Sequence, residues 1–576
     1  MRYFLYKLRA GQKEALELIE ENISHKNICL NATTGFGKTP VILSALLTKA
    51  YPKGYPIIWS VRTGNETDRP IEELKNIANK KKLQIFGLSY RGKKDMCLLA
   101  EELKINDYEE VSFLCKTKLK KCKYAKKFEN FNFDLEALVN KPLLYSEIMK
   151  YCKSKKICPY LVERVLLPCA QVVALSYNYI VNDKTAWSIR KLIPFEYSYL
   201  VVDEAHNLQH LSLNSDKISL GTFQRALKEL GMFERKEVEE LEKFIKIILE
   251  RATKIYNQLE NANGKERELD ILEFLKGVKN VEYNLSTIRK YGERIRKFKL
   301  DNNKAPRSSL YHLANFWLSS ITLVGVDGIA FIATRTGKNL ELERWDMRAK
   351  EALKETWQNF RANVFCSGTL APLDGFAETI GLENWLGKNL CLDYDRNKVR
   401  TLIVEGLTTK GERLLKNMAL KYIESLEDFL ALNTNLAIFS SSYRVQNTLL
   451  HNNLEQIAEG ARKKIFIEKQ GMRGDDARKI LDEFKACAYK EQKALLVASA
   501  QGRFAEGADF PGKELEGIFL AGIPFEKMTL RTKLYLMYYE KLYGKKKGNY
   551  YAYVVPALRR ASQALGRALR SKQDRA

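Results

Sequence analysis

The stretch of sequence that decides the fold reads Ala32-Thr33-Thr34-Gly35-Phe36-Gly37-Lys38-Thr39. It lies between a short apolar run at 27–31, typical of a buried strand, and an apolar run at 39–49 with helical character. A glycine-containing loop between a strand and a helix suits phosphate, because backbone N–H groups and the helix dipole face the anion. Lys38 would reach the β- and γ-phosphates, and the Thr39 hydroxyl would hold Mg²⁺.

Two adjacent carboxylates form the expected partner of this loop. The apolar strand predicted at 199–203 ends in the sequence Asp203-Glu204-Ala205-His206. Asp203 could ligate Mg²⁺, and Glu204 could polarise the attacking water as a general base. His206 is interpreted as a link between the nucleotide and movement of the protein. An Asp-Glu pair after a strand is a weak signal alone, but together with Lys38 it indicates ATP hydrolysis.

A third motif lies near the C-terminus and reads Gln563-Ala564-Leu565-Gly566-Arg567-Ala568-Leu569-Arg570. Arg567 and Arg570 are three positions apart and share one face of a helix. Such arginines can neutralise γ-phosphate oxygens in the transition state. Without the two motifs above, this segment would read as an ordinary basic helix.

The order of predicted elements indicates two α/β domains with parallel sheets. Strands and helices alternate over 10–61, and short apolar strands at 436–440, 495–498 and 517–521 predict a second domain of similar build. Two segments interrupt the first domain: a Lys- and Cys-rich region, and a region with two long helices at 238–259 and 271–288. The predicted boundaries are 1–86, 165–212 and 341–400 for the first domain, 87–164 and 213–340 for its insertions, and 401–576 for the second domain.

Composition narrows the class of partner. Lys plus Arg number 96 and Asp plus Glu 70, so the formal net charge is +26. That surplus favours a polyanion, either nucleic acid or an anionic membrane surface. A hydrophobic fraction of 45% excludes a disordered chain. Since no apolar run reaches the roughly 20 residues that span a bilayer, a soluble, intracellular, multidomain protein is expected.

Six of the ten cysteines lie within 73 residues. They are Cys97, Cys115, Cys122, Cys152, Cys158 and Cys169. A cluster in an intracellular chain favours a metal site over disulfides. Gaps of 17, 6 and 35 residues between Cys97, Cys115, Cys122 and Cys158 lack the tight pairs of zinc sites. Zinc is therefore disfavoured but stays an alternative, whereas four thiolates suit an iron–sulfur cluster. Cys152 rivals Cys158 as the fourth ligand.

Together these motifs resemble those of superfamily 2 helicases. The segments 60–63, 367–373, 439–443 and 502–510 are similar to motifs Ia, III, IV and V of that group, and Arg9 and Gln12 occupy the positions of its adenine-contacting glutamine motif. The sequences around Cys97 and Cys158 and the run 170–179 resemble the iron–sulfur insertion of XPD-type helicases, most closely the archaeal members. The resemblance covers nearly the whole chain.

The resemblance implies two RecA-like motor domains, with an iron–sulfur domain and a helical arch domain inserted in the first. It implies an ATP-dependent 5′→3′ DNA helicase, acting on single-stranded and forked DNA in nucleotide excision repair. The implied cofactors are ATP, Mg²⁺ and a [4Fe–4S] cluster held by Cys97, Cys115, Cys122 and Cys158. The residues expected to bind ATP are Arg9, Gln12, Thr33, Thr34, Gly35, Phe36, Gly37, Lys38 and Thr39, and those expected to touch DNA are Arg62, Thr63, Lys93 and Tyr443.

A monomer in the cytoplasm of a prokaryotic cell is expected, with repair proteins as partners and no membrane attachment. Family members continue into a further strand beyond the position of Ala576, so the end of the second motor domain is expected to be incomplete. Three alternatives stay open: a related iron–sulfur helicase of another pathway, a DNA-binding scaffold without activity, and an RNA-directed motor. The intact Lys38, Glu204 and Arg567 argue against the scaffold, and the cysteines argue against the RNA motor.

Overall fold

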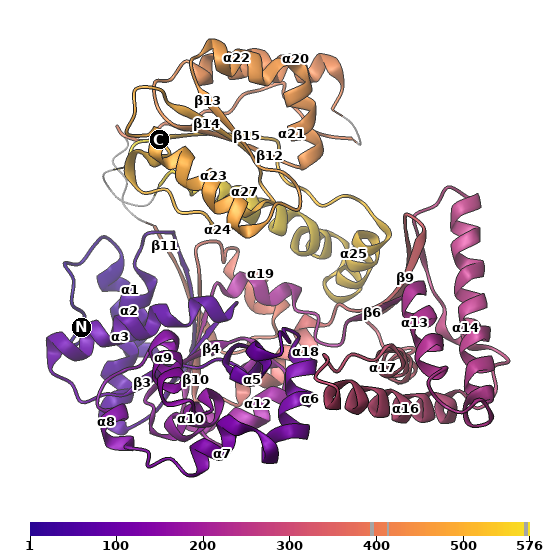
Figure 1. Ribbon diagram of the computed structural model, residues 1–576. Helices are drawn as coiled ribbons and strands as arrows, with labels where there is room; N and C mark the ends of the chain where they lie inside the picture. The colour runs from indigo at the N-terminus through magenta and orange to yellow at the C-terminus, as the bar shows by residue number, and fades with distance from the viewer. Residues whose placement is uncertain (392–396, 412–413, 570–573) are drawn as a thin grey trace.

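The computed structural model describes residues 1–391, 397–411, 414–569 and 574–576 as two α/β domains, the first of which carries two insertions (Figure 1). The first domain is built on a seven-stranded sheet with the order β11-β1-β10-β5-β2-β4-β3. All neighbouring strands are parallel. The strands are β1 (Asn27–Ala32), β2 (Ile57–Val61), β3 (Gly87–Ser89), β4 (Val172–Ser176), β5 (Tyr199–Asp203), β10 (Ala362–Ser367) and β11 (Trp385–Leu390). This architecture confirms the predicted fold class.

The inner strands are apolar on both faces because helices cover both sides of the sheet. Every residue of β2 and β10 is buried. On β2, Ile58 packs into one core, whereas Ile57 and Trp59 pack into the core on the opposite face. The second of these cores includes side chains of α1 (Gln12–Asn22), α2 (Lys38–Ala50) and α3 (Asp68–Lys81).

The second α/β domain contains a four-stranded parallel sheet with the order β13-β14-β12-β15. The strands are β12 (Leu436–Ser440), β13 (Lys464–Ile467), β14 (Ala494–Ser499) and β15 (Gly517–Ala521). Three of them coincide with predicted strands. The sequence analysis missed β13 because it is a short edge strand in which only Phe466 is fully buried.

The cysteine insertion is helical and has no large core of its own. Its helices are α4 (Lys93–Met96), α5 (Leu98–Glu102), α6 (Tyr108–Lys118), α7 (Lys123–Glu129), α8 (Leu135–Val139), α9 (Tyr145–Lys155) and α10 (Pro159–Leu166). Its boundaries differ from the predicted 87–164, because Gly87–Ser89 pairs with β4 in the main sheet and α10 continues to Leu166. Many of its apolar side chains join the core of the first domain instead.

The arch contains a four-stranded antiparallel sheet that the sequence analysis did not predict. Its strands, in the order β6-β9-β8-β7, are β6 (Asp216–Ser219), β7 (Glu266–Glu268), β8 (Ile329–Thr336) and β9 (Asn339–Asp346). Since β9 ends at Asp346, the arch extends beyond the predicted residue 340. Its helices are α13 (Leu220–Leu230), α14 (Arg235–Asn261), α15 (Ile271–Leu275), α16 (Val281–Asp301) and α17 (Ser309–Ile321).

The two long helices of the arch were predicted with unequal success. The apolar positions expected over 238–259 are buried along α14. The second helix, expected over 271–288, is instead broken between α15 and α16. Gly277 lies in that gap with a φ of 74°, a left-handed conformation that interrupts a helix.

A helical run within the predicted second domain leaves that domain's sheet. We call residues 530–554 the bridging segment; it comprises α25 (Leu530–Tyr543), α26 (Lys545–Asn549) and a π-helical turn at Tyr550–Val554. The helix that follows, α27 (Val555–Leu565), packs against α24 (Arg503–Gly507) and β15 of the second domain. In Figure 1, α25 lies between the second sheet and the arch. Among the described residues, no helix is both long enough and apolar enough to cross a membrane.

Candidate active site

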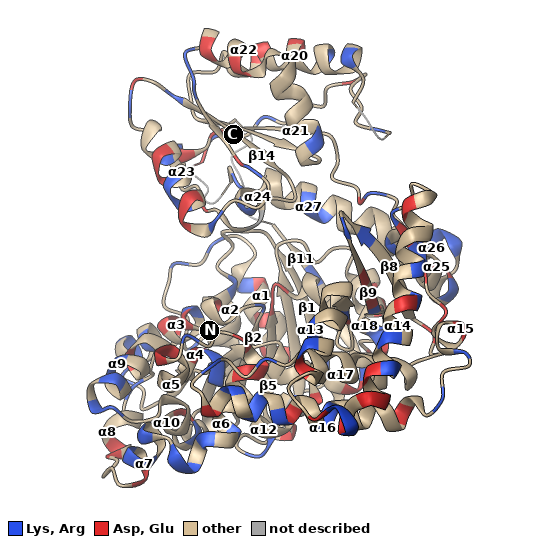
Figure 2. Ribbon diagram, turned by 45° about the vertical axis from the view of Figure 1, so that its right-hand side comes forward, with Lys and Arg blue, Asp and Glu red and all other residues tan. Residues whose placement is uncertain are grey.

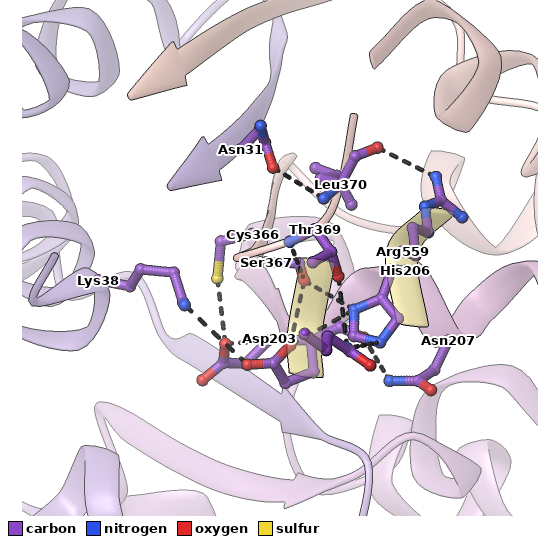
Figure 3. Close-up of polar contacts among 12 residues, drawn as sticks. Asn31, Lys38, Asp203, His206, Asn207, Cys366, Ser367, Thr369, Leu370 and Arg559 are labelled. Carbon is purple, nitrogen blue, oxygen red and sulfur yellow. Dashed lines mark hydrogen bonds and ion pairs between the residues drawn. The ribbon is translucent and has the colours of Figure 1, made fainter. Parts of the chain in front are cut away.

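The candidate site lies where β1, β5 and β10 end. These strands are neighbours in the order β1-β10-β5, so the loops that follow them meet at one edge of the parallel sheet. Ligands bind at this carboxyl edge in open α/β folds. The chain has thus brought together the phosphate loop, the Asp-Glu pair and the segment after Ser367, which lie far apart in sequence (Figure 3).

Two glycines shape the phosphate loop. Gly35 and Gly37 both have a φ of 82°, and Gly37 precedes the first residue of α2. The positive φ favours glycine at Gly37, where a Cβ atom would also lie 3.0 Å from Nε2 of Gln12 and press on that side chain. Gln12 donates to the Phe36 carbonyl at 2.5 Å, and Arg9 donates to the Gly35 carbonyl at 2.8 Å. The two residues predicted to contact adenine therefore also fix the loop.

Lys38 lies close both to the start of the phosphate loop and to Glu204. Its ammonium lies 3.5 Å from the Ala32 carbonyl and 4.0 Å from Oε1 of Glu204. Thr39 is buried in the first turn of α2. Thr33 lies against β11 through a bond from its N–H to Leu390, and Thr34 lies against Gly368. In this arrangement Lys38 lies between the phosphate loop and the carboxylate pair.

The pKa values of the two carboxylates shift in opposite directions. Burial and the neighbouring Glu204 raise the pKa of Asp203, whose Oδ1 accepts from the Glu204 N–H and from the Cys366 thiol. Burial opposes ionisation of Glu204 as well, but Lys38, His206 and the Ser367 hydroxyl outweigh it and lower its pKa. Lys38 offsets the rise in the pKa of Asp203 only in part, so a bound Mg²⁺ would supply further positive charge to Asp203, whereas Glu204 is already ionised as a base must be.

Glu204 also has a strained backbone. Its φ is 47°, in the left-handed region that side chains with a Cβ rarely adopt. Such conformations persist where the surrounding structure enforces them, and they cluster at functional sites. Here the turn directs the Glu204 carboxylate toward Lys38 and Ser367.

Ser367 connects the catalytic carboxylate to His206. Its hydroxyl donates to Oε2 of Glu204 at 3.1 Å, lies 2.7 Å from Nδ1 of His206, and accepts from the Thr369 N–H at 3.2 Å. Burial lowers the pKa of His206 to about 4, so the ring is neutral. Because the single hydroxyl proton goes to Glu204, Nδ1 carries the ring proton and Nε2 is an acceptor.

That acceptor faces the second domain. Nε2 of Gln563 lies 3.0 Å from Nε2 of His206 and 3.4 Å from the Thr369 hydroxyl. A continuous hydrogen-bonded chain therefore runs from Glu204 through Ser367 and His206 to Gln563. It places the predicted Gln563 in the site.

A second bond set crosses the same interface, and its residues were not predicted. Arg559 donates to Oε1 of Gln209 at 3.0 Å and to the Leu370 carbonyl at 3.1 Å. Burial lowers the pKa of Arg559 to about 10. The sequence carries no signal for this pair, since Gln209 and Arg559 lie 350 positions apart.

Arg567 is bonded to carbonyls of the second domain, although its charge also helps to lower the pKa of Glu204 in the first domain. Its Nε donates to the Ala505 carbonyl at 2.6 Å and its Nη1 to the Ala508 carbonyl at 2.7 Å, both in the second domain. Arg570, the other predicted arginine, lies outside the described residues. The first domain thus presents an assembled site, to which the second contributes the Gln563 side chain and the nearby charge of Arg567.

The residues expected to touch DNA lie in three different parts of the chain. Arg62 and Thr63 are exposed after β2 in the first domain. Lys93, in the cysteine insertion, places its ammonium 5.0 Å from the centre of the Tyr160 ring. Tyr443 begins α21 (Tyr443–Leu449) in the second domain, and burial with the nearby Glu468 raises its pKa to about 12.

Glu468 is a further residue that the sequence analysis missed. It is only 2% exposed and accepts from the backbone N–H groups of Ser499 and Arg503 at 3.2 and 2.7 Å. It joins the end of β13 to the segment identified as motif V. No pattern marks it, because a single acidic residue after a short strand is common.

The four predicted cluster cysteines lie near one another in the cysteine insertion. Cys97, Cys122 and Cys158 each precede a helix, α5, α7 and α10 respectively, and Cys115 lies within α6. Burial raises the pKa of Cys158 to about 12, and the other three thiols add to the shift. Across the described ranges, no set of three or more His, Cys, Asp or Glu side chains is close enough to hold a metal ion.

The rival ligand Cys152 has a different environment. It is fully buried among the apolar side chains of the first domain's core, whereas Cys158 is partly accessible. The donor set of four thiols, three of them at helix starts where N–H groups stabilise a thiolate, suits an iron–sulfur cluster. Cys158 therefore stays the predicted fourth ligand.

These features define a class of protein: an ATPase whose site lies between two α/β domains of the helicase type. Residues 59–224 match the family described as DEAD_2, and residues 426–576 match the family described as Helicase C-terminal domain. The chain is 22% identical to the general transcription and DNA repair factor IIH helicase subunit XPD/RAD3 of Saccharomyces cerevisiae, over 95% of this chain and 82% of that protein.

The similarity to an archaeal relative extends over a larger share of that relative's length. The chain is 24% identical to the ATP-dependent DNA helicase XPD of Sulfolobus acidocaldarius, over 99% of this chain and 95% of that protein. A solved structure titled "XPD_Helicase" superposes with a TM-score of 0.68 at 22% identity, over 99% of this chain and 95% of that one. The chain is a homologue of the XPD/RAD3-type helicases, as its motifs predicted.

Proposed function

We propose that this protein is an ATP-dependent DNA helicase that moves 5′→3′ along single-stranded DNA and acts in nucleotide excision repair. The observation that carries the proposal is the hydrogen-bonded chain from Glu204 to Gln563, since it links the base of an ATPase to the opposite domain. The relatives support the choice of substrate: one is named an ATP-dependent DNA helicase and another a DNA repair factor.

Each site residue has a role in this proposal. Lys38 binds the β- and γ-phosphates, while Thr39 and Asp203 hold Mg²⁺. Glu204 accepts a proton from the attacking water. Arg567 has to leave the carbonyls of Ala505 and Ala508 before it can reach the γ-phosphate, so closure of the two domains is part of catalysis.

The positive surplus suits the phosphate backbone of DNA. In Figure 2, Lys and Arg occur on α6, α12 (Asp183–Arg190) and α16, which come from the cysteine insertion, the first domain and the arch. We infer that a single strand follows the surface formed by these parts. A monomer in the cytoplasm of a prokaryotic cell, together with repair-protein partners, completes the proposal.

We propose that Cys97, Cys115, Cys122 and Cys158 hold a [4Fe–4S] cluster. The cluster would supply cross-links that the insertion lacks, because its apolar side chains largely belong to the first domain's core. The proposal assigns the cluster a structural role in holding residues 90–166 together, and no step of ATP hydrolysis depends on it.

The function is tested with duplexes that carry either a 5′ or a 3′ single-stranded tail. We expect ATP-dependent unwinding of the 5′-tailed duplex and ATPase activity stimulated by single-stranded DNA. Unwinding of the 3′-tailed duplex alone would contradict the polarity. ATPase activity that responds to RNA but not to DNA would replace the proposal by an RNA-directed motor.

The cluster is tested by Cys115→Ser, with Cys152→Ser as the matched control. Loss of a ligand should lower the iron content and loosen residues 90–166, so that unwinding fails while ATP binding survives. The control should keep its iron, because Cys152 lies in the apolar core. Bound zinc in anaerobically purified wild-type protein would contradict the iron–sulfur assignment.

A further inference from the structure

Helix α25 covers one face of the arch's antiparallel sheet, although its place in the sequence is within the second domain. Side chains alternate along β8, so Phe331 and Ala333 pack into the arch core, whereas Ala330 and Ile332 pack against α25. Figures 1 and 2 both show α25 beside this sheet. The sheet is therefore a layer between the arch helices and a helix of the bridging segment.

Polar contacts fix the first turn of α25 to the same sheet. Arg531 lies 2.7 and 2.9 Å from the two carboxylate oxygens of Glu343, and its guanidinium carbon is 4.1 Å from the centre of the Trp345 ring. Glu343 and Trp345 are two positions apart on β9 and so share a face. The Leu530 N–H also donates to Oε2 of Glu266, on β7, at 2.9 Å.

The bridging segment is held equally on the first domain. The Tyr538 hydroxyl donates to Glu351 at 2.7 Å, and the Tyr551 hydroxyl donates to Glu378 at 3.0 Å. Gln209 donates to the Tyr551 carbonyl at 2.7 Å. Residues 530–555 therefore join the arch to the first domain through buried and hydrogen-bonded contacts.

Contacts with the second domain begin on either side of this segment, because α27 packs against α24 and β15 and its Ala564 lies in the core of that domain. Arg560 pairs with Glu526 in the connection that precedes α25. Beyond α27, Arg567 bonds the second domain through Ala505 and Ala508. The two transitions lie at Gly522, which follows β15 with a φ of 83°, and at the start of α27, where Pro556 has no N–H to bond the preceding turn.

We propose that α25 is a brace that fixes the base of the arch to the first domain, and that the second sheet, together with α27, pivots about Gly522 and the start of α27 while α25 stays in place. Movement of α25 with the second sheet would expose Ile332 and Trp345 to water and break the contacts of Arg531. Rotation at the two connections costs far less, and hinges consist of a few loop or element-terminal positions of this kind. That the second sheet moves at all rests on the proposed function.

The brace assigns Arg531 a positioning role in strand separation. A fixed arch gives a stationary surface against which a pulled strand can be separated from its complement. If the arch base is loose, ATP hydrolysis continues but part of each movement displaces the arch instead of the duplex. Arg531 touches no part of the nucleotide site, so its loss should separate the two activities.

The first test compares Arg531→Ala with Lys541→Ala. Lys541 pairs with Asp327 from the same helix, but both side chains are largely exposed, so this pair should contribute little. In Arg531→Ala we expect amide exchange of residues 329–336 to rise about tenfold and unwinding to fall about tenfold, with DNA-stimulated ATPase activity within about twofold of wild type. The control should match wild type, and the swap Arg531→Glu with Glu343→Arg should restore unwinding.

The second test needs no unwinding and so separates this inference from the proposed function. Amide exchange of 329–336 and 530–543 is compared with and without ADP–beryllium fluoride and single-stranded DNA. Equal protection in both states supports a brace that stays seated. Faster exchange in both segments with the nucleotide would show that α25 leaves the sheet, and it would overturn the proposal. Normal unwinding by Arg531→Ala with raised exchange would overturn the positioning role.

Discussion

The two sides of the nucleotide cleft differ in how complete they are. On the side of the first domain, Glu204 already accepts a hydrogen bond from Ser367 and lies 4.0 Å from the Lys38 ammonium. On the opposite side, Arg567 is bonded to carbonyls of its own domain. Both sides come from the same kind of parallel sheet, so the difference lies in their side chains.

The difference indicates how the rate of ATP hydrolysis can stay low until the two domains close on the nucleotide. An arginine bonded to two carbonyls is stably placed, because a guanidinium has a fork of donors that fits them. It reaches the phosphate only when the domains approach and the new contacts exceed the old ones. The first side would then bind ATP, and the second would decide when ATP is cleaved.

The largest effect on ATP turnover is expected from a substitution on the first domain's side of the nucleotide cleft. Lys38→Ala should lower ATP turnover by about 10⁴, because the charge on the transferred phosphoryl group loses its nearest cation. Binding of single-stranded DNA should persist. Turnover is measured at saturating ATP, with Lys49→Ala as the control, since Lys49 lies at the far end of the same helix. Near-normal turnover would remove Lys38 from the site.

A smaller effect is expected from the second side. Arg567→Lys keeps the charge but loses the fork, so we expect turnover to fall about 10²-fold while ATP affinity changes little. Arg444→Lys, an exposed residue on α21 of the same domain, is the matched control. If ATP affinity fell and the turnover number did not, Arg567 would belong to the binding side and the contrast would disappear.

Ser367→Ala sharpens the comparison within the first side. The hydroxyl helps to lower the pKa of Glu204, so its removal should raise that pKa. A base is active only when ionised; activity is lost as pH falls through its pKa, and the acid limb of the rate profile should therefore move to higher pH. Turnover at neutral pH should fall about tenfold. An unmoved acid limb would show that Ser367 does not act on Glu204.

The smallest effect concerns stability. Burial lowers the pKa of His206 to about 4, below its ordinary value of about 6.5. Below pH 6.5 the unfolded state binds the proton that the folded state refuses, so the free energy of unfolding should fall by up to about 1.4 kcal/mol per pH unit. Urea titrations between about pH 6.5 and pH 5 should show a steeper loss in wild type than in His206→Asn. Equal slopes would contradict a buried neutral ring.

The sequence predicted the first side well because its signals are local. The phosphate loop and the Asp203-Glu204 pair each follow an apolar strand, and the strand dictates where the loop ends up. Ser367 and Gln563 could be placed only within motifs, since their contacts depend on distant strands. The contact between Gln209 and Arg559 could not be predicted from the sequence, because one buried hydrogen bond has no compositional signature.

For the fold as well, elements with a clear local pattern could be predicted and the others could not. Strands of the two parallel sheets were predictable from short apolar runs, whereas the antiparallel sheet of the arch was not. Its strand β9 has half-buried and buried positions in turn, a weaker pattern that lies beside strongly helical sequence. The bridging segment reads as part of the second domain by position, and only tertiary packing assigns it to the arch and the first domain.

The strand order of the first sheet has a consequence for the order in which the protein can fold during synthesis. β1, which leads into the phosphate loop, pairs only with β10 and β11 among the strands of this sheet. Both follow the arch, so a nascent chain that ends before residue 362 gives β1 no partner. At about 5–20 residues per second, the ribosome needs on the order of tens of seconds to supply them. The nucleotide site would thus be among the last parts of the first domain to form, after both insertions have been made.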